Sequence, residues 1–73
     1  MTTRETIEAE LKQMVFDLLH ERDDEELEEG HKDALAHVAA AEQAGILDNT
    51  QATAWRNEVE KATAFSRIRM KGE

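Results

Sequence analysis

Hydrophobic residues in the first twenty positions recur every three or four residues, which places them on one side of a helix. The stripe consists of Ile7, Leu11, Met14 and Leu18, with Val15 and Leu19 beside it. The spacing predicts a helix that begins at Thr2 or Thr3, where Thr2 and Glu5 fit a capping box. Phe16 lies off this stripe, on a flank shared with His20, and is therefore a candidate for an exposed contact.

A second, narrower stripe predicts another helix in the middle of the chain. It contains Leu27, His31, Ala34, Leu35, Val38 and Ala41, and its alanines let a neighbouring helix approach closely. Asp23 or Asp24 can cap this helix, because carboxylates stabilise a helix N-terminus. Gly30 weakens a helix by about 1 kcal/mol relative to alanine. The sequence leaves three possibilities open: a break near Asp23, a break near Gly30, or one continuous helix.

The clearest local signal lies between the second and third predicted helices. The run Ala44-Gly45-Ile46 is typical of a helix end in which Gly45 adopts the left-handed conformation. Asp48 and Gln51 then form a capping box for the next helix. A helix end followed so closely by a helix start predicts a tight helical hairpin.

A third helix is predicted from the shared face of Ala52, Trp55, Val59 and Ala62. At this spacing Trp55 fits the core better than an exposed binding site. Phe65 and Ile68 fall off that face, so we expect the helix to fray near Ser66. Residues 66–73 would then form a basic tail that is disordered, docked on the acidic residues, or used as an extended binding segment.

The whole pattern predicts an all-α fold, a two- or three-helix hairpin or bundle, with a helical domain at residues 1–65 and a tail at residues 66–73. The chain has 73 residues and no cysteine. A chain of this length buries only about 60% of its unfolded surface, and no disulfide compensates for this. We therefore expect homodimerisation to complete the bundle.

The same composition bears on location. The absence of cysteine suits a reducing compartment and predicts a cytoplasmic protein. No apolar run reaches the roughly 20 residues of a membrane span, and the N-terminus lacks the pattern of a signal peptide. We expect no membrane association.

Negative charge is concentrated in residues 21–29, which hold seven carboxylates in nine positions. Residues 1–33 contain twelve acids and four bases, whereas residues 34–73 contain five of each, so the net charge of −8 comes from the first half. This balance disfavours direct binding to nucleic acid. An acidic helical face can instead imitate the spacing of phosphates and occupy a basic site on another protein.

These features predict a non-enzymatic protein-binding factor, an inhibitor or regulator that occupies the basic, nucleic-acid-binding site of a larger protein. The expected contact residues are Phe16, His20, Glu21, Asp24, Glu25, Glu28 and Glu29. The five acids among them recur at spacings of three and four along one side of a helix. The competing interpretation is that they form only a solvated surface. No catalytic residue or cofactor is expected, because the chain has one serine, no cysteine and no phosphate-binding loop.

The alternative function is metal binding in a helical bundle. Asp17 and His20, like Glu28 and His31, are separated by three residues and share a helix face. Two acid-x-x-His motifs can build a dinuclear metal site in a four-helix bundle. The short Asp17 side chain and Gly30 within the second motif weaken this interpretation, and we assign no metal ligand.

Overall fold

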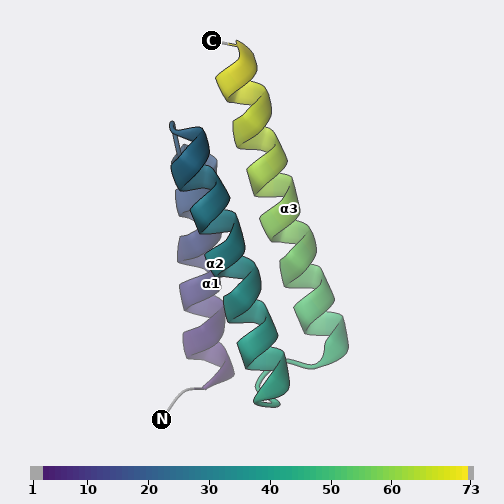
Figure 1. Cartoon of the computed structure of the whole chain (residues 1–73). Helices are drawn as coiled ribbons and strands as arrows, with labels where there is room; N and C mark the ends of the chain where they lie inside the picture. The colour runs from purple at the N-terminus through teal and green to yellow at the C-terminus, as the bar shows by residue number, and fades with distance from the viewer. Residues whose placement is uncertain (1–2, 73) are drawn as a thin grey trace.

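Three helices packed side by side form the protein in a computed structural model that describes residues 3–72 (Figure 1). Helix α1 spans Arg4–His20, α2 spans Asp24–Gln43 and α3 spans Asn49–Gly72. Helices α1 and α3 run in the same direction and α2 runs against them (Figure 1). The predicted all-α fold is therefore confirmed, in its three-helix form.

Helix α1 begins where the sequence predicts. Thr3 is the N-cap, and its hydroxyl oxygen accepts a hydrogen bond from the backbone N–H of Thr6 at 3.2 Å. The expected capping box of Thr2 with Glu5 includes Thr2, which lies outside the described residues. The predicted stripe faces the core, whereas Phe16 remains 55% exposed.

The break between the first two helices lies at residues 21–23. Glu21 and Asp23 have extended backbone, and the Asp23 carboxylate accepts from the backbone N–H of Glu25 at 3.0 Å. Gly30 lies inside α2, and a Cβ added there would come within 3.1 Å of Leu18 Cδ2. Gly30 is therefore neither a break nor a hinge: it allows α2 to approach α1 closely.

The connection between α2 and α3 has the predicted hydrogen bonds. Gly45 has a φ of 75°, and the backbone N–H of Ile46 donates to the Ala41 carbonyl at 2.9 Å. The Asp48 carboxylate accepts from the Gln51 N–H at 2.8 Å, while the Gln51 side chain accepts from the Asp48 N–H at 3.0 Å. Both helix ends are thus stabilised by neighbours in sequence, so local residues alone could predict this hairpin.

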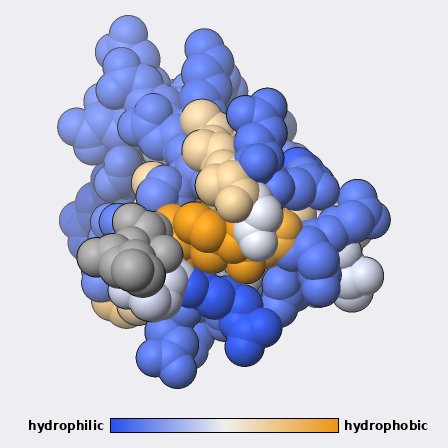
Figure 2. Space-filling model, turned by 90° about the horizontal axis from the view of Figure 1, so that it is seen from below, coloured by the Kyte–Doolittle hydropathy of each residue, from blue (hydrophilic) through white to orange (hydrophobic). Residues whose placement is uncertain are grey.

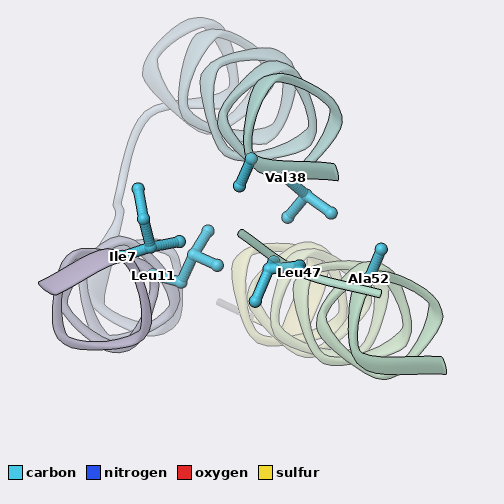
Figure 3. Packing of buried hydrophobic residues seen from close by; sticks show 6 residues of the cluster. Ile7, Leu11, Val38, Leu47 and Ala52 are labelled. Atoms are coloured by element: carbon cyan, nitrogen blue, oxygen red, sulfur yellow. The ribbon is translucent and has the colours of Figure 1, made fainter. Parts of the chain in front are cut away.

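The core consists of two adjoining clusters. One lies toward the α2–α3 connection (Figure 3), and the other lies toward the α1–α2 connection. Trp55 is partly buried against the first cluster, as expected for a core residue. Figure 2 shows that the hydrophobic centre reaches that end of the bundle, where hydrophilic residues surround it. The clusters comprise Ile7, Leu11, Val38, Ala41, Leu47 and Ala52, and Leu18, Leu27, Ala34, Val59 and Ala62.

The expected fraying near Ser66 is wrong, because α3 continues to Gly72. Ser66 is fully buried and its hydroxyl donates to the Leu18 carbonyl. The Arg69 guanidinium donates to the Leu19 carbonyl at 2.7 Å and to the Glu21 carbonyl. These contacts satisfy carbonyls at the C-terminus of α1, which lack partners within their own helix. Residues 66–72 are therefore an ordered part of the bundle.

Candidate functional site: an acidic groove between α1 and α2

A groove between α1 and α2 carries five carboxylates and no basic side chain. Two apolar residues, Met14 and Leu18, contribute to its lining together with Gly30. Leu18 is buried and Met14 is half-buried, so they form the floor. We call this feature the acidic groove; its carboxylates belong to Asp17, Glu21, Glu26, Glu29 and Asp33.

Helix periodicity and one close helix contact produce the groove. On α2, Glu26, Glu29 and Asp33 are separated by three and four residues, which puts them on one flank. Gly30 lies on the same flank and brings the backbone of α2 against Leu18. The opposite wall comes from Asp17 on α1 and from Glu21 in the connection.

The groove has an unbalanced negative charge. Its lining has a formal charge of −5. Within residues 3–72, none of the five carboxylates forms an ion pair with a basic side chain. Asp17 accepts a hydrogen bond from the neutral amide of Gln13 at 2.9 Å. Like charges so close together repel one another, and a bound cationic group would relieve that repulsion.

The five acidic residues that were predicted to share one side of a helix, as an acidic stripe, lie on separate surfaces in the structure. Glu21 precedes α2, so the stripe is not continuous. Glu21 and Glu29 line the acidic groove, whereas Asp24 and Glu28 line a separate hollow beside α3. Glu25 is exposed and lines neither. The stripe divides because the chain turns at residues 21–23, and because successive positions of α2 face different neighbouring helices.

Basic residues of α3 balance the second part of the stripe. Arg67 contacts the Glu28 carboxylate at 2.7 Å, and Lys71 also lines that hollow. Docking of residues 66–73 on the acidic residues was one of the three arrangements predicted for this segment. The ion pair between Arg67 and Glu28 is a contact of that kind. Negative charge near α3 is therefore partly neutralised within the chain, unlike that of the acidic groove.

Phe16 and His20 lie together but outside the acidic groove. Their ring centroids are 4.3 Å apart, and His20 Nδ1 lies 2.8 Å from the Phe16 carbonyl oxygen. Neither residue lines the groove. The predicted contact set thus occupies more than one surface. Sequence reasoning missed the groove residues Glu26 and Asp33, although their spacing with Glu29 was the available signal.

The two acid-x-x-His motifs do not come together. His31 Nε2 lies 2.6 Å from a Glu60 carboxylate oxygen on α3, whereas His20 contacts its own helix. In the described part of the chain, no three His, Asp or Glu side chains are close enough to hold a metal. The geometry does not support the metal-binding alternative.

A separate ion pair joins the other end of α2 to α3. Arg56 contacts the Glu42 carboxylate at 2.6 Å, and Asn49 donates to the same carboxylate at 3.4 Å. The hydrogen bond from Arg56 lowers the pKa of Glu42, with a further contribution from its charge. Glu42 lies outside the acidic groove, so we assign this pair a structural role.

Comparisons with protein-family models, curated proteins and solved structures found no match to this chain. Among residues 3–72, no helix is both long and apolar enough to cross a membrane.

Proposed function

We propose that this protein is a non-enzymatic binding factor whose acidic groove receives a basic segment of a larger protein. The observation that carries the proposal is the set of five groove carboxylates, none of which is paired with a basic side chain in residues 3–72. Clustered negative charge accelerates association with a basic partner, and an apolar floor slows dissociation. The groove combines both properties.

The size of the groove suits a few side chains of a protein segment. Its volume is about 290 Å³, at the lower limit of the roughly 300–1,000 Å³ typical of small-molecule pockets. A segment with several Lys or Arg side chains and one small apolar side chain would match its walls and floor. Surfaces that bind nucleic acid are rich in Lys and Arg. Occupying one of them would make this protein an inhibitor or regulator, and we propose that it acts as a cytoplasmic homodimer.

The test compares two variants with the same change in charge. The groove variant carries Glu26→Gln, Glu29→Gln and Asp33→Asn. The control variant carries Asp24→Asn, Glu25→Gln and Glu28→Gln, which lie on α2 outside the groove. Binding kinetics are measured with a synthetic helical peptide that contains four Lys or Arg residues and one leucine. Captures from a lysate with the same variants then identify natural partners.

We expect the groove variant to associate at least about tenfold more slowly at low ionic strength, because steering by charge raises association rates by this amount or more. The control variant should lose much less, and the difference should shrink at high salt. An equal decrease in the association rate of both variants would show that the overall negative charge of the protein, and not the acidic groove, attracts the peptide. No loss in either would show that the acids are merely a solvated surface.

A further inference from the structure

A second surface, between α1 and α3, has the opposite character from the acidic groove. Val15 and Leu19 on α1 face Ala62 and Phe65 on α3 across a shallow hollow. Glu58 and Lys61 are the charged residues of its lining, and their charges balance. The acidic groove and this hollow lie on different flanks of α1. The groove is lined by Met14 and Leu18 and the hollow by the next residues, Val15 and Leu19, which point about 100° away.

Of the large exposed hydrophobic side chains of residues 3–72, one lines this hollow and the other two lie one helical turn from a lining residue. They are Phe16, Phe65 and Ile68, which are 55%, 56% and 72% exposed. Phe65 lines the hollow. Phe16 is three residues before Leu19, and Ile68 is three residues after Phe65, so each neighbours a lining residue on its own helix. We call this surface the α1–α3 face; it comprises Val15, Phe16, Leu19, Ala62, Phe65 and Ile68.

Single exposed hydrophobic residues are common, but a contiguous exposed group of them marks an interaction site. Aromatic residues are enriched at the centres of such sites. We infer that the α1–α3 face is the surface on which a second copy of this chain docks. The inference rests on the proposed homodimer and adds which face forms it; it does not depend on what the acidic groove binds.

The balanced charge of this face favours a second copy over a basic partner. Two chains that each carry a net charge of −8 repel one another. That repulsion is weakest when the balanced α1–α3 face forms the contact and the acidic groove of each copy points away. A strongly basic partner would gain little at this face, because Glu58 is already offset by Lys61.

A dimer of standard size would use most of one broad side of the bundle. Its Cα atoms extend over 41 × 21 × 16 Å, and a standard interface requires about 800 Å² from each partner. A twofold dimer uses the same patch on both copies. Because the groove lies on another flank of α1, both grooves would remain open. The dimer could then hold two basic segments of one partner, which raises avidity without any new contact.

The test is sedimentation velocity over a range of protein concentrations, for the parent, Phe65→Glu and a matched control, Ala36→Glu. Ala36 is exposed on α2 and lies outside the face, so both variants gain the same charge at an exposed helix position. We expect a parent dimer at micromolar concentration. Phe65→Glu should raise the dimer dissociation constant by at least about thirtyfold, as for a central interface residue, and Ala36→Glu by much less.

Ile68→Glu is a second variant, at the most exposed of the three positions. It should behave like Phe65→Glu, and circular dichroism of both should show a folded helical monomer. A dimer that neither variant weakens more than Ala36→Glu does would overturn the inference and leave the homodimer standing. A parent that stays monomeric at about 100 μM, well above the concentrations that specific dimers need, would overturn both. Retained peptide binding by Phe65→Glu would show that the groove acts independently.

Discussion

Arg69→Met should destabilise the protein, although Arg69 lies in a segment that the sequence suggested would fray. The guanidinium of Arg69 donates to the carbonyls of Leu19 and Glu21, at the C-terminus of α1. Methionine retains much of the apolar stem but removes the charge and both hydrogen bonds. The Glu21 side chain lines the acidic groove, so this contact also helps to position one wall of the candidate site.

The size of the effect follows from the contacts. Hydrogen bonds to charged groups contribute about 1.5–3 kcal/mol, and a cation at a helix C-terminus contributes about 0.3–1 kcal/mol. These contributions overlap, and Arg69 is only half-buried. We therefore expect a loss of about 2 kcal/mol in the free energy of unfolding. For a domain of this length, that loss lowers the melting temperature by about 8–16 °C.

The assay is urea unfolding followed by circular dichroism at one fixed protein concentration, with Arg67→Met as the control. Arg67 lies on the same part of α3, but its ion pair with Glu28 is exposed on both sides. Exposed pairs contribute about 0–1 kcal/mol, so Arg67→Met should change the midpoint little. Equal effects of the two variants would refute the assignment of Arg69, as would a loss below about 0.5 kcal/mol for Arg69→Met.

Two further predictions concern the α2–α3 hairpin. Glu42→Gln should destabilise the protein at neutral pH, because Arg56 lowers the pKa of Glu42 in the folded state and favours its ionised form. That contribution is lost as pH falls through the lowered pKa, so urea midpoints of parent and variant should converge between about pH 7 and about pH 3; a constant difference would contradict it. Gly45→Ala should cost about 1–2 kcal/mol through its left-handed backbone alone, because an added Cβ there meets no atom within 4 Å. Thermal melting should show no comparable loss for Gly72→Ala, which also has open space but no positive φ.

The sequence was most informative where a structural feature depends on adjacent residues. Gly45 and the Asp48–Gln51 capping box make their hydrogen bonds within a few positions of themselves. The apolar stripe of α1 could be predicted equally well, because residues on one side of a helix recur with a period of 3.6 residues. The helical segments and most of the core could therefore be predicted without knowledge of the fold, whereas the number of helices stayed open between two and three.

The acidic residues show what could not be predicted from neighbouring residues in the sequence. Their charge and spacing were evident, but their division between two surfaces depends on which helix each one faces. Glu29 lines the acidic groove, whereas Glu28, the residue before it, pairs with Arg67 of α3. Neighbouring residues on a helix point about 100° apart, so a compact acidic segment is necessarily distributed around its helix.

The tertiary structure decided the remaining features because their partners are distant in sequence. The sequence left open whether the first helix breaks near Asp23, breaks near Gly30 or continues unbroken. In the structure Gly30 lies inside α2, in close contact with Leu18 on another helix. Ser66 and Arg69 looked like parts of a loose basic tail. Their hydrogen bonds reach carbonyls 48–50 residues away, and no local pattern predicts such contacts. Local residues determined where helices form and where α2 ends, whereas the packing between helices determined that α3 continues past Ser66 and which charges remain unpaired.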